Sequence, residues 1–345
     1  MLRFISGAGA IIAGVVVVAT ASAHHSTIGI YDVDKTVEIT GTVTSVSWRN
    51  PHGQITLDVK DDTGAVVEWS AETAAISVMR NRGVDTDVIV VGDVVTIAGD
   101  PSRRNLPAIF GNNILLPSGY EFDFGANNPH FPAGLSGNMV GKQVADQANV
   151  DKAVAAADGI FRVWQTLMSD PAAFPIFKGG YPLSEAGKQG LAQWNPLDNA
   201  LLHCGTKGTP LIMITPIPIE FVRQGADIML RIEEYDARRL IHMSETAVAP
   251  TEHTLYGFSK GRWEGTTLIV STTNIAAGHF DHLGVLQSDQ ITVVERFIPN
   301  ATYDRLDYVM SVTDPVNFTE TFDLKRYFLW GPEMSVHPYE CLDRY

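Results

Sequence analysis

The sequence has little positive charge, only two cysteines and, after its first residues, no long apolar run. It holds 25 Lys and Arg against 39 Asp and Glu, which gives a formal net charge of −14. Nucleic-acid binding and docking on anionic lipid both need clustered Lys and Arg, so this balance argues against both. After the leader, no stretch reaches 18 uninterrupted apolar residues, and we expect no stable membrane insertion of the mature chain.

Several catalytic signatures are also missing from the sequence. It contains no G-x-S-x-G, no H-E-x-x-H, no Walker loop, no C-x-x-C-H and no GxGxxG followed by a helix. Each of these patterns positions a specific nucleophile, metal ligand or phosphate cradle. Their absence disfavours the serine hydrolase, zinc protease and nucleotide-dependent enzyme classes.

The first 23 residues have the three parts of a secretory signal. Met1 to Arg3 carries one positive charge, Phe4 to Ala19 is apolar, and Ala21-Ser22-Ala23 offers small residues for cleavage. The alternative is a single membrane anchor, but the run falls short of the roughly 20 apolar residues that a span needs. We therefore expect a signal peptide over residues 1–23, a mature chain that begins at His24, and a periplasmic or secreted protein.

The two cysteines, Cys204 and Cys341, lie in the second half of the chain. In an oxidising compartment an even pair indicates one disulfide. Closing so long a loop contributes about 4–5 kcal/mol in the chain-entropy model. The alternatives are a catalytic thiol or a thiolate metal ligand beside His203.

Residues 24–120 have the pattern of a small barrel. Apolar and polar residues alternate in the predicted strands, and Asp61 to Gly64 has hairpin chemistry. Three strands, a helix and two strands are the element order of a five-stranded OB-like barrel. The predicted elements are strands over 37–48, 54–60 and 65–71, a helix over 73–82, and two strands within 88–98.

The rest of the chain divides into a connector and a second β domain. Residues 121–200 are irregular, with predicted helices over 151–168 and 184–193. Residues 201–345 hold at least six short strands, which indicates an antiparallel β-barrel or sandwich. The fold class is therefore mainly β, with two β domains and a short helical connector.

Two stretches resemble uncharacterised families. The first carries His24-His25-Ser26, Gly41-Thr42-Val43, Trp48-Arg49-Asn50-Pro51-His52 and Trp69, and resembles a family of small exported bacterial domains of unknown function. The second carries Gly261-Arg262-Trp263-Glu264-Gly265 and Val294-Glu295-Arg296-Phe297, and looks like an uncharacterised exported β-rich domain. That family often has an acidic residue after the glycine, where Thr266 stands here. The resemblances imply export and a bacterial origin, and they imply no reaction.

A copper site is one hypothesis for the mature N-terminus. An N-terminal His24 would offer its amine and a ring nitrogen to one ion, and a second imidazole would complete a nitrogen-rich site that suits Cu(II). His52 is the expected partner, because the segment through Tyr31 and Asp32 can fold back over the barrel mouth. The amine must lose its proton, so affinity should rise with pH. The alternative is an unstructured His24 and a turn histidine bonded to backbone.

A second candidate is the segment His279-Phe280-Asp281-His282. Two imidazoles and a carboxylate within four residues suit a metal site or a His–Asp acid/base pair. In a strand His279 and Asp281 share a face and His282 does not, so all three converge only in a loop. The alternative is a set of solvated loop side chains.

The third candidate is a group of charged residues in the predicted C-terminal sheet, of which Glu234, Arg239, His242 and Glu295 are the candidate site residues. The other members of the group are Glu233, Arg238, Arg262, Glu264 and Arg296. Charges at alternate strand positions usually mark a solvated face, but in a closed barrel they can line the lumen. Acids, an arginine and a histidine around a cavity would suit acid/base work on a small organic molecule, with Arg239 binding an anion.

Three functions remain open at this stage. The first is a C-terminal barrel that binds a small, partly apolar molecule and acts on it by cofactor-free acid/base chemistry, as a lyase, isomerase or hydrolase. The second is a periplasmic copper-binding protein that uses His24 and His52, with copper as the only cofactor that the residues suggest. The third is a ligand carrier without turnover.

Overall fold

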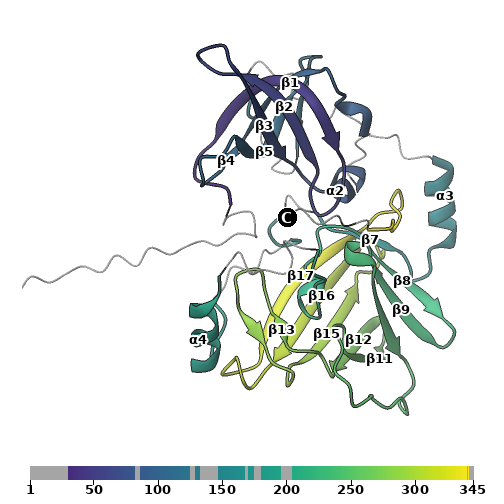
Figure 1. Ribbon diagram of the computed structural model, residues 1–345. Coiled ribbons are helices and arrows are strands. Elements are labelled where there is room, and N and C mark those ends of the chain that lie inside the picture. Colours follow the sequence, from purple (N-terminus) through teal and green to yellow (C-terminus); the bar gives the residue numbers. More distant parts are fainter. Residues whose placement is uncertain are drawn as a thin grey trace, which may run out of the picture.

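The structure is a computed structural model that describes residues 30–81, 86–124, 129–132, 147–167, 170–174, 180–195, 204–339 and 341. Two β-barrels make up most of it, one above the other in Figure 1. The prediction of a mainly β fold with an OB-like barrel followed by a second barrel is confirmed. Within these ranges no helix has the length and apolar character needed to cross a membrane.

The N-terminal barrel is closed by its third and fifth strands. The order β3-β2-β1-β4-β5 is antiparallel throughout, and a parallel pairing of β3 with β5 joins the ends. Alternate residues of each strand point inward, as the period-two pattern of β1 predicts, and they form one apolar core. The strands are β1 Val37–Ser47, β2 Gln54–Lys60, β3 Val66–Glu72, β4 Val94–Pro101 and β5 Ala108–Leu115, with β6 Glu121–Asp123 added beside β5.

One strand of this barrel lies elsewhere than predicted. Residues 88–98 contain only the start of β4, preceded by a 3-10 turn at Thr86–Val88, and the fifth strand is β5. The apolar residues before Gly92 were misassigned because Val90 and Val91 are exposed loop residues. The helix predicted over 73–82 is the shorter α2, Ile76–Asn81.

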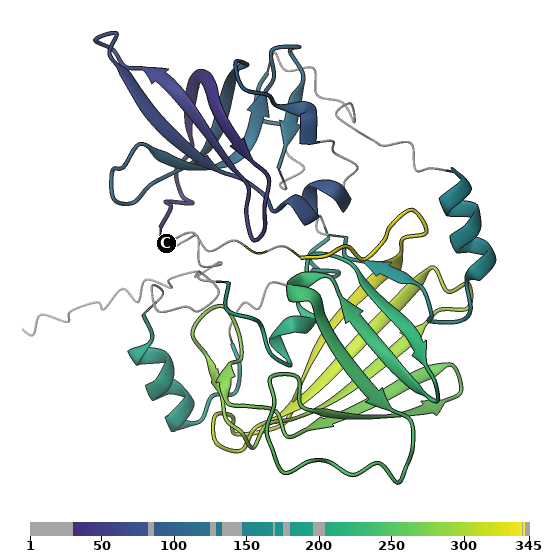
Figure 2. The same cartoon turned by 45° about the vertical axis from the view of Figure 1, so that its right-hand side comes forward.

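Figure 2 shows the C-terminal barrel below the N-terminal one. Among the described residues its strands close in the order β10-β11-β12-β15-β16-β17-β7-β8-β9. All neighbours are antiparallel except β10 and β11, which run parallel. Its strands are β7 Val163–Gln165, β8 Ile219–Gln224, β9 Asp227–Ile232, β10 Ala237–His242, β11 Phe258–Glu264, β12 Thr267–Thr273, β15 Thr292–Pro299, β16 Arg305–Thr313 and β17 Phe322–Trp330.

The connector contributes one strand to this barrel. The helix predicted over 151–168 is wrong beyond its first part, because α3 spans Gln147–Ala156 and the chain then turns at Gly159, whose φ is +57°. Trp164, which falls within the predicted helix, lies in β7 and is fully buried. The second connector helix is confirmed as α4, Glu185–Gln193, which Ser184 caps by accepting the Gly187 N–H.

The predicted disulfide between Cys204 and Cys341 is confirmed. It joins residues 137 positions apart, with their Cα atoms 6.0 Å apart. The last described residues run between the two barrels (Figure 1), and Cys341 forms a parallel bridge with Asn50 of the N-terminal barrel. The disulfide therefore fixes the C-terminal segment in the joint between the two barrels.

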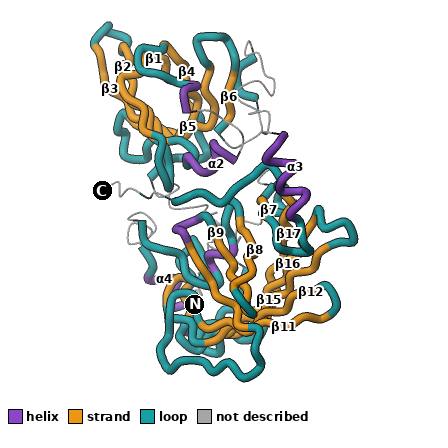
Figure 3. Tube along the Cα trace, turned by 90° about the vertical axis from the view of Figure 1, so that its right-hand side faces the viewer, coloured by secondary structure: helices purple, strands orange, loops and turns teal. Residues whose placement is uncertain are grey.

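Three elements meet in this joint. Val78 of α2, Ile217 before β8 and Tyr339 of the C-terminal segment form a small apolar cluster. The turn from Glu233 through Asp236, which connects β9 to β10, binds the backbone of the C-terminal segment. The His337 N–H donates to the Glu233 carboxylate, and the Tyr339 N–H donates to the Asp236 carboxylate. Figure 3 shows this side of the molecule, with α2 facing the second barrel.

The joint contains a carboxyl group with a raised pKa. Glu233 is fully buried, and burial raises its pKa from 4.5 to about 7, against the smaller lowering effects of the His337 N–H, Ser77 and Arg80. Asp236 adds a small raising effect. The protonated form is therefore the one that the folded state favours.

The expected result is a stability that falls as the pH rises. The contribution of Glu233 is complete below pH 4.5 and is lost as the pH passes about 7. Between pH 5 and 8.5, Glu233 should lower the free energy of urea unfolding of the wild type by roughly 1–3 kcal/mol. This decrease should be absent in Glu233→Gln. Glu320→Gln, at an exposed loop position, is the control. Equal pH slopes for the wild type and Glu233→Gln would contradict the assignment.

Candidate functional site

The strands of the C-terminal barrel point two opposite charges into its core. In β10 the buried residues stand at every second position: Ala237, Arg239 and Ile241. In β15 Glu295 is buried, as are the apolar residues two positions before and after it. Side chains two apart on a strand share one face. Arg239 and Glu295 therefore face the barrel interior, with 1% and 0% of their side chains exposed.

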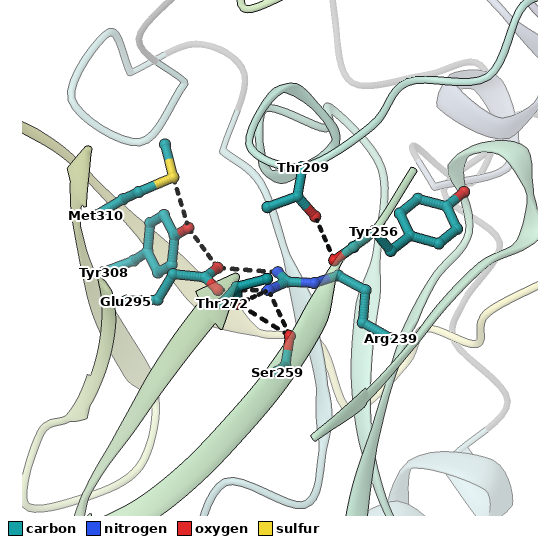
Figure 4. A network of polar contacts seen from close by, with 8 residues as sticks. All are labelled: Thr209, Arg239, Tyr256, Ser259, Thr272, Glu295, Tyr308 and Met310. Atoms are coloured by element: carbon teal, nitrogen blue, oxygen red, sulfur yellow. Dashed lines mark hydrogen bonds and ion pairs between the residues drawn. The ribbon is translucent and has the colours of Figure 1, made fainter. Parts of the chain in front are cut away.

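These two side chains form a bidentate ion pair (Figure 4). Arg239 Nη1 lies 2.9 Å from Glu295 Oε1, and Nη2 lies 2.5 Å from Oε2. Nη2 also donates to Thr272 Oγ1 at 3.2 Å and to Ser259 Oγ at 3.4 Å. Tyr308 OH donates to Glu295 Oε1 at 2.7 Å. The pair is thus surrounded by hydroxyl groups from β11, β12 and β16.

The charges of this pair set the protonation of its neighbours. Burial disfavours the Arg239 cation, but Glu295 outweighs this effect, so the pKa of Arg239 is raised. Burial and the Glu295 charge together raise the pKa of Tyr308 well above its usual range. Tyr308 therefore stays protonated at neutral pH and serves as a hydrogen-bond donor.

A second buried ion pair lies close to the first. Lys207 Nζ is 2.5 Å from Glu234 Oε1, and both side chains are less than a tenth exposed. One member of each pair acts on Tyr256. Burial and the charge of Glu234 raise the pKa of Tyr256, Arg239 lowers it, and the result is a pKa of about 12. Thr209 anchors this segment, because its hydroxyl donates to the Tyr256 carbonyl oxygen at 3.3 Å.

The structure brings Arg239, Glu295 and Glu234 into one region and places His242 apart from them. The expectation that His242 lines the lumen is not met, because it stands three positions after Arg239 and faces the opposite side of β10. Its Nδ1 lies 3.2 Å from Asp227 Oδ2, and its ring stacks on Phe258 at a centroid distance of 4.8 Å.

Asp281 has a local structural role in the segment after β13 (Gly278–His279). Its Oδ1 accepts the Leu283 N–H at 2.8 Å and the Val285 N–H at 3.0 Å, and burial raises its pKa to about 6. His279 pairs through its backbone with Leu286 of β14 (Leu286–Gln287), and burial lowers its pKa. In the part of the chain that the structure describes, no group of three or more His, Cys, Asp and Glu side chains could hold a metal ion.

The predicted copper ligands are described only in part, because His24 lies outside the described residues. His52 follows a turn in the N-terminal barrel, and its Nδ1 lies 3.0 Å from the Thr73 carbonyl oxygen and 3.6 Å from Glu72 Oε1. Tyr31 OH donates to the other oxygen of Glu72 at 3.0 Å. The first described residues of the chain therefore reach the surroundings of His52.

Sequence reasoning missed the neutral and cationic partners of the site. Tyr308 could have been found, since it sits among buried apolar residues at alternate positions of β16. The other missed residues depend on strand register or on loops, which the pattern does not disclose. They are Lys207, Ser259, Thr272 and Arg326.

The comparisons with known proteins concern mainly the N-terminal barrel. Residues 13–108 match the model of a family described as "Family of unknown function (DUF6152)". This match covers less than half of the chain and supports the resemblance to an uncharacterised domain family. No curated protein matches the chain.

The buried pair yields a test of its energetics. Glu295→Gln leaves the Arg239 cation buried without a counter-charge, and should lower the free energy of unfolding by about 3–5 kcal/mol. The double variant Arg239→Met/Glu295→Leu removes both charges and should recover much of that loss. Chemical denaturation measures both values.

A matched control lies on the barrel surface. The Arg262–Glu264 pair is more than half exposed, so Glu264→Gln should change stability by less than about 1 kcal/mol. If the double Arg239/Glu295 variant loses as much stability as Glu295→Gln alone, the two charges do not act as a pair.

Proposed function

We propose that the C-terminal barrel binds a small, partly apolar molecule in its lumen, and that the Arg239–Glu295 pair with Tyr308 holds the polar group of that molecule. The observation that carries the proposal is the position of this pair on the inward face of the barrel. Binding sites for small molecules are largely apolar and have a few polar groups at defined positions.

The energetics of burial support this proposal. Moving two charges out of water costs several kcal/mol per ion, and apolar side chains of similar volume often stabilise a core as well or better. The surrounding inward positions are already apolar, among them Phe221, Leu230 and Phe297. An ion pair in their midst is better explained by a ligand than by stability alone.

The width of the barrel is the second support. Eight-stranded barrels are filled by side chains or hold one small ligand, and the diameter grows with strand number. The described strands of the C-terminal barrel close a ring that has one strand more than these eight-stranded barrels. The ligand proposed for its interior is therefore a single small molecule and not a larger one.

The contacts of Glu295 favour a carrier over an acid/base enzyme. Both carboxylate oxygens already accept hydrogen bonds, from Arg239 and from Tyr308. A carboxylate has about four acceptor positions, of which these bonds take three, and a general base must bring a remaining one within reach of the proton that it takes. Lyase, isomerase or hydrolase activity by this group would depend on the one acceptor position that remains, and it stays a prediction.

Binding can be tested with the neutral fluorescent probe N-phenyl-1-naphthylamine. Val270 is fully buried on β12 and pairs with Glu295 in register, so Val270→Phe should fill the lumen and weaken probe binding at least about tenfold. Val248→Phe, at a position that is 85% exposed, is the control. A flat titration of the wild type, or equal affinity in Val270→Phe, would refute lumen binding.

The copper-binding hypothesis is retained as a second candidate because Tyr31 approaches Glu72 beside His52. An ion would bind Nε2 of His52, since the Nδ1–H donates to the Thr73 carbonyl oxygen, an arrangement that orients many metal-binding imidazoles. The other ligands would be the amine and ring of His24.

Copper titration tests this candidate. His52→Ala and His24→Ala should each lose at least about tenfold in Cu(II) affinity, because each removes a ligand. His253→Ala, which alters an exposed histidine, should lose none. Binding should strengthen as the pH rises through about 8, where the α-amine loses its proton. An intact mass that does not start at His24 would rule the site out.

A further inference from the structure

Arg326 stands on the inward face of the same barrel. It lies in β17 directly opposite Tyr308 of β16, and residues that face each other across antiparallel strands point to the same side. Its side chain is almost fully buried, and its guanidinium carbon lies 4.2 Å from the centroid of the Phe328 ring. Arg326 is thus a buried cation close to Tyr308 and to the Arg239–Glu295 pair.

Neutral groups satisfy most of its N–H donors. Nη1 donates to the carbonyl oxygens of Met213 at 2.7 Å and Thr215 at 3.3 Å, and Nη2 donates to Thr166 Oγ1 at 2.6 Å and again to the Thr215 carbonyl. Its Nε has no hydrogen-bond partner among the described residues. The same is true of the Nε of Arg239.

The charges in this region do not cancel. We call Lys207, Glu234, Arg239, Glu295 and Arg326 the buried charge cluster, since they are the charged groups that act on Tyr256 and Tyr308 or pair with those groups. Lys207 pairs with Glu234 and Arg239 pairs with Glu295. Among the described residues of the cluster, Arg326 is therefore left as one unbalanced positive charge.

An unbalanced buried charge is unfavourable. Burial lowers the pKa of Arg326 to about 9, and Tyr308 and Glu234 offset this only in part, so the group is still a cation at neutral pH. Carbonyl dipoles reduce the cost of burying the cation, but an anion would balance its charge. The apolar remainder of the lumen would receive the body of a ligand that carries such an anion.

We propose that the ligand of the C-terminal barrel is a partly apolar monoanion, such as a carboxylate, whose charge is balanced by Arg326. This inference rests on the proposed lumen-binding function and narrows its ligand to one chemical class. The Nε–H of Arg326, which has no partner among the described residues, is the donor expected to bind the anion, because the single hydrogen of the Tyr308 hydroxyl is already donated to Glu295.

Two matched probes test the sign of the charge. N-phenyl-1-naphthylamine is neutral, and 8-anilino-1-naphthalenesulfonate has the same ring system with a sulfonate added. The full chain should bind the sulfonate at least about tenfold more tightly, at 0.15 M salt so that the acidic surface is screened. This preference should disappear in Arg326→Met, whereas Arg305→Met, which alters a half-exposed arginine, should keep it.

A second variant at the same position guards against misfolding of Arg326→Met. Arg326→Lys keeps a cation there, so it should retain the preference for the sulfonate that Arg326→Met loses. Circular dichroism and the unfolding midpoint establish that each variant is folded.

The outcomes separate this inference from the function on which it rests. If the wild type binds neither probe, lumen binding itself fails. If it binds both with equal affinity, or if folded Arg326→Met keeps the preference, lumen binding stands and the anionic ligand is refuted.

Discussion

The ion pair between Arg239 and Glu295 is the interaction on which the C-terminal barrel depends. It joins β10 to β15 across the interior, with β11 and β12 between them in the barrel order, and hydroxyl groups from these intervening strands bond to it. Each partner is tolerable in the core only because the other is present. The pair therefore links β10 and β15 through the interior and determines which polar groups remain for a ligand.

The turn between β9 and β10 serves two regions at once. Glu234 belongs to the buried charge cluster, while Glu233 and Asp236 bind the C-terminal segment in the joint between the barrels. Two successive residues of this turn, Tyr235 and Asp236, have φ values of +57° and +50°, which non-glycine residues seldom adopt. This backbone allows neighbouring carboxylates to point in different directions.

Strand periodicity carried most of what could be predicted. It indicated the two barrels, and it included Arg239 and Glu295 in a larger group of charged residues that could line a barrel interior or lie on a solvated face. It grouped His242 with them, although an odd spacing along one strand reverses the side on which a residue lies. Arg326 could not be found in this way, because its place beside Tyr308 follows from the register of β16 and β17, and its acceptors lie in the loop before β8 and just after β7. Register is a long-range property that local patterns do not contain.

The two barrels share a constraint of parity. If every neighbour in a closed ring of strands ran antiparallel, directions would alternate and the number of strands would be even. The described strands close rings of odd number, so each ring needs a parallel pair: β3 with β5 in one barrel and β10 with β11 in the other. A parallel neighbour obliges the chain to return along the barrel before it pairs again. The returning segment between β10 and β11 brings Tyr256 to the buried charge cluster. The position of Tyr256 is thus a consequence of the direction in which β11 must run.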